Sequence, residues 1–159
     1  MFKLKTIQRS LLSAALIASL PLAVMAQGKD PVKVGLVSSK SGVFAQQGEE
    51  VIRAIKFAID EANAKGGVDG RKIEVKEADD EGTPDAGRRE AEKLAREGYN
   101  LLIGAIPSSI SLAIAQNLDR WDAAYFVVAS KSDKLTGDTC KPRSFRTNHS
   151  DAMDIAMIN

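Results

Sequence analysis

The sequence has little of what most catalytic sites and disulfide frameworks are built from. It contains one cysteine and one histidine in 159 residues. Cys140 cannot close a disulfide bond within the chain, so it is either a free thiol or pairs with another molecule. His149 is the only imidazole available as a general base, and no G-x-S-x-G nucleophile elbow accompanies it. We interpret His149 as a loop or capping residue between a strand and a helix.

Phosphate-binding fingerprints and metal-binding motifs are also absent. Neither G-x-G-x-x-G nor G-x-x-x-x-G-K-[ST] occurs. The acidic residues Asp79, Asp80, Glu81 and Asp85 do not match a calcium loop, which needs alternating ligands, a turn glycine and a distal glutamate. We therefore expect no cofactor, no metal and no catalysis, and we interpret this acidic run as a solvated loop. A small flavodoxin-like enzyme is the alternative, which turnover on a tested substrate would support.

One long apolar run occurs, and it lies at the N-terminus. Met1–Arg9 carries three bases and no acid, and Leu11–Met25 is apolar. Val24-Met25-Ala26 then places small side chains at the two positions that a signal peptidase reads. We predict a signal peptide over residues 1–26, cleaved after Ala26, and export to the periplasm. A membrane anchor is the alternative, but the run is shorter than the roughly 20 residues that a span needs.

The exported chain is nearly neutral. The predicted signal peptide carries Lys3, Lys5 and Arg9 and no acid, so its removal leaves 19 basic and 21 acidic residues and a net charge of −2, against +1 for the whole chain. This balance provides no basic field for nucleic acid or anionic lipid. We expect a monomer without a nucleic-acid partner.

Short apolar runs and helical patterns alternate along the chain after residue 31. Strands are expected at residues 32–37, 72–78, 101–104, 124–129 and 144–147. Helices are expected at residues 48–64 and 85–97, from 108 to 121, and from 150 onward. The second helix has Thr83 as its N-cap and Pro84 at its first position. This order predicts an α/β fold with a doubly wound parallel sheet.

Three polar loops follow the first, third and fourth strands, at Ser38–Gly48, Ala105–Ser109 and Ala129–Lys134. The carboxyl ends of parallel strands meet at one edge of a sheet, so these loops should gather there. Ser108 stands at a strand-to-helix turn, where backbone amides and the helix dipole favour an anion. A plain N-cap role for Ser108 is the alternative. A neutral edge rich in hydroxyl groups suits the binding of a small polar molecule.

Five segments carry a recognisable pattern, namely V-K-V-G-L-V-S-S-K-S-G-V-F-A-Q-Q-G, D-E-A-N-A-K-G-G-V-D-G-R-K-I-E-V, A-D-D-E-G-T-P-D-A, L-L-I-G-A-I-P-S-S and S-F-R-T-N-H-S-D-A-M. Together these segments resemble the leucine/isoleucine/valine-binding family of type I periplasmic solute receptors. The resemblance implies a two-lobed receptor that is considerably longer than this chain. Residues 27–148 would form its first lobe, and residues 149–159 would begin the first helix of the second lobe.

The resemblance also implies ligand-binding residues. Ser108, beside Ser109, matches the serine that holds the ligand carboxylate through its hydroxyl and a helix-terminal amide. Ser130 and Lys131 match an Ala-Thr pair that meets the ligand's carboxylate and ammonium groups. The complete set is Ser41, Gly42, Gln47, Ser108, Ser109, Ser130 and Lys131.

Two of these residues depart from the family pattern. Lys131 replaces a threonine hydroxyl with a cation, and Gln47 stands where an aromatic ring often lines the side-chain pocket. Both favour a more polar or more acidic solute than a branched aliphatic amino acid. The resemblance implies an inner-membrane ABC permease as the partner. A ligand-sensing regulator built on the same fold is the alternative.

Overall fold

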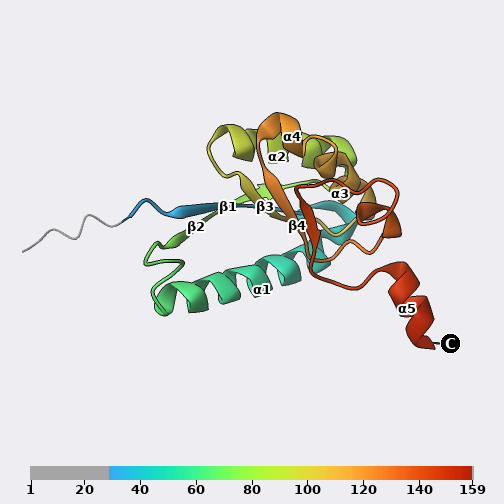
Figure 1. The fold of residues 1–159 in the computed structure, drawn as a ribbon, viewed down its shortest axis with the longest axis horizontal. Helices are drawn as coiled ribbons and strands as arrows, with labels where there is room; N and C mark the ends of the chain where they lie inside the picture. Colours follow the sequence, from blue (N-terminus) through green and yellow to red (C-terminus); the bar gives the residue numbers. More distant parts are fainter. Residues whose placement is uncertain (1–28, 159) are drawn as a thin grey trace, which may run out of the picture.

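Residues 29–158 are described by a computed structural model, and the predicted signal peptide lies outside them. Five parallel strands form one sheet in the order β2-β1-β3-β4-β5. The strands are β1 (Val32–Ser38), β2 (Ile73–Asp79), β3 (Leu101–Gly104), β4 (Ala124–Val127) and β5 (Ser144–Arg146). Helices cover both faces of this sheet, which confirms the predicted doubly wound α/β fold (Figure 1).

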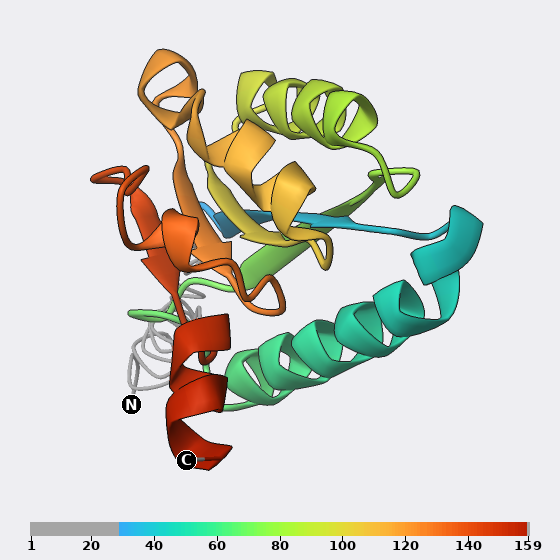
Figure 2. The ribbon, with the colours of Figure 1, turned by 90° about the vertical axis from the view of Figure 1, so that its right-hand side faces the viewer.

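The two faces carry different helices. The long helix α1 (Ala45–Ala64) lies alone on one face, whereas α2 (Pro84–Arg96), α3 (Ser108–Ala115) and α4 (Leu118–Trp121) cover the other (Figures 1 and 2). Two short 3-10 turns, η1 (Gly42–Phe44) and η2 (Asp133–Leu135), lie in loops after β1 and β4. The last helix, α5 (Asp151–Ile158), projects away from the sheet.

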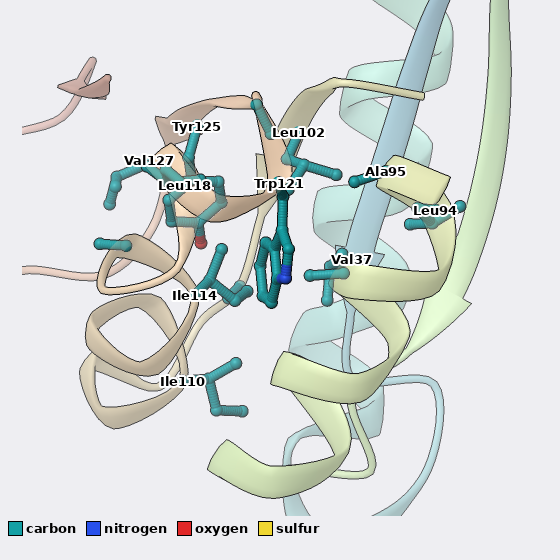
Figure 3. Close-up of a cluster of buried hydrophobic side chains, with 14 of the residues drawn as sticks. Val37, Leu94, Ala95, Leu102, Ile110, Ile114, Leu118, Trp121, Tyr125 and Val127 are labelled. Carbon is teal, nitrogen blue, oxygen red and sulfur yellow. The ribbon is translucent and has the colours of Figure 1, made fainter. Parts of the chain in front are cut away.

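The main core lies between the sheet and α2, α3 and α4 (Figure 3). The stripe predicted for residues 108–121 is confirmed, because Ile110, Ile114, Leu118 and Trp121 are all buried there. The predicted single helix is wrong in one respect, since it breaks between α3 and α4. The Asn117 amide side chain donates to the Ala113 carbonyl at the break, at 2.9 Å, and the apolar stripe continues across it.

Helix α2 begins and packs as its sequence predicts. The Thr83 hydroxyl accepts a hydrogen bond from the Ala86 N–H at 3.3 Å, and Pro84 occupies the first turn. Its apolar side includes Ala91 and Leu94, both buried against the sheet.

Helix α1 begins at Ala45, three residues before the predicted start at Gly48, because η1 runs directly into it. Gln47 and Gly48 therefore belong to its first turn. A Cβ atom at Gly48 would lie 1.7 Å from the Ser39 carbonyl oxygen, so only glycine allows the helix to pass this close to the end of β1.

Candidate functional site

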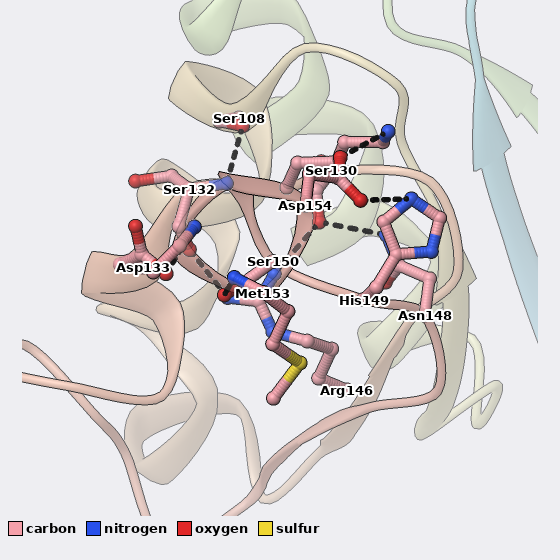
Figure 4. A network of polar contacts seen from close by, with 12 residues as sticks. Ser108, Ser130, Ser132, Asp133, Arg146, Asn148, His149, Ser150, Met153 and Asp154 are labelled. Carbon is pink, nitrogen blue, oxygen red and sulfur yellow. Dashed lines mark hydrogen bonds and ion pairs between the residues drawn. The ribbon is translucent and has the colours of Figure 1, made fainter. Parts of the chain in front are cut away.

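The second and third of the three predicted loops meet directly at the carboxyl edge of the sheet (Figure 4). The Ser132 N–H donates to the Ser108 hydroxyl at 3.2 Å, which joins the loop after β4 to the start of α3. The Ser130 hydroxyl lies 3.1 Å from the Ala105 carbonyl and 3.0 Å from the Ile106 carbonyl, and it donates to them. These contacts hold the two loops as one unit.

Ser108 is the first residue of α3 and not its N-cap. Pro107 occupies the cap position, and no side chain caps the helix. The plain N-cap interpretation of Ser108 is therefore wrong, because its hydroxyl serves Ser132 and not a helix N–H. Within residues 29–158, the N–H groups of Ser108 and Ser109 donate to no acceptor. They carry the partial positive charge of the helix N-terminus, so they can bind an anion.

The turn that leads into α3 passes tightly over the end of β1. Gly104 has φ +128°, and a Cβ atom there would lie 2.0 Å from the Val37 carbonyl oxygen. Ala105 follows with φ 51°, a left-handed conformation that is unusual for a residue with a side chain. Its N–H donates to the same Val37 carbonyl at 2.8 Å. The turn that positions Ser108 is therefore held by its contacts with the Val37 carbonyl at the end of β1.

Ser130 is buried, with 1% of its surface exposed. Its hydroxyl lies 2.6 Å from the Ser111 hydroxyl, which lies 2.8 Å from the phenol of Tyr125. The phenol in turn donates to the Gly104 carbonyl at 2.8 Å. Burial raises the pKa of Tyr125 well above its ordinary value, although the Ser111 hydrogen bond lowers it, so the phenol remains protonated. The Ser130 hydroxyl supports the loops from inside the lobe.

The Ser130 carbonyl also accepts two hydrogen bonds from the strand end of β5. The Arg146 guanidinium donates to it at 3.2 Å, and the Asn148 side-chain amide donates at 3.2 Å (Figure 4). Arg146 donates to the Ser132 carbonyl as well. These contacts fix the loop after β4 on its other side.

Lys131 is exposed and forms an ion pair with the last helix. Its ammonium lies 2.8 Å from one carboxylate oxygen of Asp154, and the His149 ring lies 3.1 Å from the other (Figure 4). The Lys131 carbonyl accepts from the Asp151 N–H at 3.0 Å. The junction position predicted for His149 agrees with this placement. In this arrangement the charge of Lys131 is compensated by Asp154.

The first loop lies apart from the other two. Ser41, Gly42 and Gln47 are all exposed, the last on the first turn of α1. Within the described residues, no hydrogen bond joins these three residues to the loops after β3 and β4. The first loop packs instead against residues 79–82, at the end of β2.

The interpretation of the acidic run as a solvated loop is wrong for Asp80, which is fully buried. Burial raises the pKa of Asp80, although hydrogen bonds from Ser39 and Gly82 lower it. Partial burial also raises the pKa of Asp79, but hydrogen bonds from Lys40, Glu81 and Ser41 outweigh it, and the pKa lies below its ordinary value. Within residues 29–158, no group of three acidic, histidine or cysteine side chains could hold a metal ion.

Sequence reasoning missed several residues that build this edge. They are Asp79, Asp80, Ser111, Tyr125, Ser132, Arg146 and Asn148. The available signal was position, since Asp79 and Asp80 directly follow the strand predicted at residues 72–78, and Ser132 lies next to Lys131 in a predicted site loop.

Comparison of the sequence and the fold with known proteins identifies the family of this chain. The family described as periplasmic binding protein matches residues 31–158. The chain belongs to the periplasmic binding protein family. Among its relatives is the Leu/Ile/Val-binding protein BraC3 of Rhizobium johnstonii, 33% identical over 107 residues, which cover 67% of this chain and 29% of the relative.

Solved periplasmic binding proteins share the fold. An ABC transporter substrate-binding protein from Desulfitobacterium hafniense, in complex with leucine, is 29% identical with a TM-score of 0.69, covering 82% of this chain and 38% of the other. An ABC transporter solute-binding protein from Rhodopseudomonas palustris, in complex with 3,4-dihydroxybenzoic acid, is 29% identical with a TM-score of 0.69, covering 77% of this chain and 33% of the other.

This chain spans about a third of the length of the periplasmic binding proteins that it matches. The family is one of solute-binding proteins. None of the helices that the structure describes is long and apolar enough to cross a membrane.

Proposed function

We propose that the chain forms the first lobe of an exported solute-binding protein, which delivers a small carboxylate-bearing solute to an ABC importer. The observation that carries the proposal is the N-terminus of α3, where the Ser108 and Ser109 N–H groups point to no acceptor within the described chain. Such a helix end favours an anion. The two solved relatives bind leucine and 3,4-dihydroxybenzoic acid, which have in common a carboxylate.

Under this proposal, Ser108 and Ser109 hold the carboxylate. Ser41 and Gly42 contact the solute from the first loop, and Gln47 lines the pocket for the rest of the solute. Ser130 contributes its backbone, because its hydroxyl is already bonded to Ser111 and to the loop after β3.

Lys131 is the residue through which this site would select among solutes. Its ammonium lies 2.8 Å from the Asp154 carboxylate, so an acidic solute would compete with Asp154 for it. A hydrogen bond to a charged group is worth about 1.5–3 kcal/mol, so a solute acid can compete with this exposed pair. We expect the receptor to prefer acidic or amide-bearing solutes over leucine, and Lys131→Thr to shift that preference toward leucine. An unchanged solute profile in Lys131→Thr would mean that Lys131 serves α5 alone.

One lobe supplies too little binding energy for a working receptor. Micromolar affinity requires about 8 kcal/mol. An exposed helix N-terminus contributes about 0.3–1 kcal/mol, and a hydrogen bond to charge about 1.5–3 kcal/mol. Association itself costs about 4–15 kcal/mol in lost motion. We therefore propose that residues 27–148 bind the solute together with a second lobe, which begins near residue 149 and excludes water when it closes.

Export is part of the same proposal. We propose that residues 1–26 direct the chain to the periplasm, where it works with an inner-membrane ABC permease. N-terminal sequencing of the periplasmic protein should begin at Gln27. A cytoplasmic product that retains Met1 would contradict export.

Amide chemical shifts in the purified chain test the proposed carboxylate site. Benzoate and L-leucine should move the Ser108 and Ser109 amide signals, whereas benzamide and leucinol, which lack the carboxylate, should not. Ser108→Ala should weaken the response at least threefold, and Thr136→Ala, which removes an exposed hydroxyl in the loop after β4, should leave it unchanged. Equal responses to benzoate and benzamide would refute the carboxylate site.

A further inference from the structure

The loop after β1 lies against the end of β2 and the loop that follows it. The Ser39 hydroxyl donates to a carboxylate oxygen of Asp80 at 2.5 Å. The Lys40 N–H donates to the Asp79 carboxylate at 2.8 Å. Two residues after Lys40, a Cβ atom at Gly42 would lie 3.6 Å from the Glu81 carbonyl oxygen. Residues 39–42 thus lie against residues 79–82, which we name the bracket loop.

The Ser39–Asp80 contact is the buried part of this interface. Both residues are fully buried, and the same Asp80 oxygen accepts from the Gly82 N–H at 2.9 Å. The other oxygen of Asp80 has no partner within the described residues. A buried polar group that loses its partner is costly, so Ser39 and Asp80 hold one another in place.

The Asp79 carboxylate ties the bracket loop to the exposed part of the first loop. One of its oxygens accepts from both the Lys40 N–H and the Glu81 N–H, at 2.8 and 2.9 Å. Gly42 and Gly82 have φ of +74° and +67°, and Glu81 has φ of 50°. Glycine adopts the left-handed conformation without steric penalty, so Gly42 and Gly82 allow the backbone to turn at these points.

The bracket loop is also connected to the other half of the site. Gly87 of α2 lies between Asp80 and α3, since a Cβ atom at Gly87 would lie 3.3 Å from the Asp80 Cβ and 2.4 Å from the Ile110 Cγ2. Ile110 is in the first turn of α3, two residues after Ser108. Asp80 therefore has contact with the first loop on one side and lies one glycine away from α3 on the other.

We propose that Asp79 and Asp80 are positioning residues for solute binding, which fix Ser41 and Gly42 of the first loop relative to the N-terminus of α3. This inference rests on the proposed function, since it gives that site its geometry. Neither aspartate needs to touch the solute. Asp80 acts through Ser39, and Asp79 acts through the Lys40 amide.

Amide hydrogen exchange in the purified chain tests the positioning role. In Asp79→Ala and Ser39→Ala, exchange at Lys40, Ser41 and Gly42 should accelerate at least tenfold beyond any change in global stability. Asp79→Asn keeps an accepting oxygen and should restore protection to within threefold of the unmodified chain. Thr83→Ala is the matched control, because Thr83 lies in the adjoining turn and caps α2, and within residues 29–158 it makes no hydrogen bond to the first loop.

The same variants separate positioning from a purely structural role. With L-leucine and benzoate as probes, the changes in amide chemical shift at Ser41 and Gly42 should fall in Asp79→Ala to less than half of those in the unmodified chain. They should recover in Asp79→Asn, and the shift changes at Ser108 should persist in both variants. The proposal is overturned if exchange at residues 40–42 follows global stability in every variant, as in Thr83→Ala. Absence of any probe response in the unmodified chain would contradict the proposed function. The hydrogen-exchange result would still decide whether the bracket loop positions the first loop.

Discussion

The two faces of the sheet are packed very differently. On the face covered by α2, α3 and α4, the strand residues Val37, Leu102, Tyr125 and Val127 are all 0% exposed. On the face covered by α1 alone, Leu101 and Phe145 are 38% and 48% exposed. Helix α1 buries only Gly48 and Ile52 among its 20 residues. One face is a finished core, and the other is only partly covered.

The difference shows which side of the lobe supports the proposed site. The start of α3, the Ser130–Ser111–Tyr125 hydroxyl cluster and Asp80 all belong to the packed face or to its edge. The open face instead has a cavity of about 240 Å³ between α1 and the sheet. This cavity is lined by Val34, Ile55, Ala58, Ile59, Ile73, Leu101, Ile103 and Phe126. The geometry of the α3 edge therefore does not depend on how well α1 is packed.

The largest expected effect compares two neighbouring leucines of β3. Leu102→Ala removes a fully buried side chain from the packed face, which should lower the free energy of unfolding by about 2–5 kcal/mol. Leu101→Ala makes the same change on the open face, where we expect a loss of about 1 kcal/mol or less. Urea denaturation followed by circular dichroism measures both. Equal losses would show that the two faces are equally well packed.

The second comparison adds volume to each face. Ala91→Leu inserts a larger side chain where α2 is fully buried, and overpacking should cost about 1–3 kcal/mol. Ala58→Leu points the same side chain toward the open apolar cavity, where we expect no loss and a gain of up to about 1 kcal/mol. Thermal denaturation measures both changes. A loss on Ala58→Leu as large as that on Ala91→Leu would contradict an open cavity.

The third comparison uses pH and the two adjacent aspartates, of which Asp80 lies against α2 and Asp79 faces the first loop. The pKa of Asp79 is lowered by folding, so its ionisation stabilises the fold above the ordinary value of about 3.9, and this stabilisation is lost as pH falls. Asp79→Asn should therefore lower the free energy of unfolding most at neutral pH and least near pH 3.

Asp80 should show the opposite dependence. Burial and the neighbouring charge of Asp79 raise the pKa of Asp80. Its ionisation therefore destabilises the fold as pH rises from the ordinary aspartate pKa through the raised pKa of the folded state. The Ser39 and Gly82 hydrogen bonds oppose this effect, and Tyr125 nearby remains neutral. The free energy of unfolding of Asp80→Asn should therefore increase relative to that of the unmodified chain as pH rises. Parallel pH profiles of stability for the two Asn variants would contradict this assignment.

The smallest effect concerns α5, which packs on neither face and buries no residue. The Lys131–Asp154 ion pair is exposed, and such pairs contribute about 0–1 kcal/mol. Lys131→Met should leave global stability nearly unchanged but accelerate amide exchange in α5 several-fold, and added salt should have a similar effect on the unmodified chain. Unchanged exchange in α5 would show that the ion pair does not hold this helix.

Features set by local sequence were predictable. The strand–helix order follows from the alternation of apolar runs, the start of α2 from Thr83 and Pro84, and the buried stripe of α3 and α4 from its spacing. The placement of the loops at one edge followed from the parallel order alone. These features depend on residues only a few positions apart.

Features set by distant contacts were not predictable. Asp80 is buried because Ser39 lies 41 residues before it and α2 folds over it. Ser130 points inward, where its hydroxyl lies 2.6 Å from the hydroxyl of Ser111, 19 residues earlier. Lys131 pairs with Asp154, 23 residues later. The sequence pattern assigned these residues to loops correctly, but periodicity carries no information about the direction of a loop side chain.

Calorimetric titration of residues 27–159 with benzoate, L-leucine and acidic amino acids tests most directly whether this lobe holds only half of a solute site. We expect weak binding in the millimolar range, with little or no measurable heat, because the amides of α3 meet the carboxylate without a second lobe to exclude water. Ser108→Ala should weaken any millimolar binding that is observed at least threefold. A saturable isotherm with micromolar affinity would contradict the proposal, since it would show that a single lobe is sufficient.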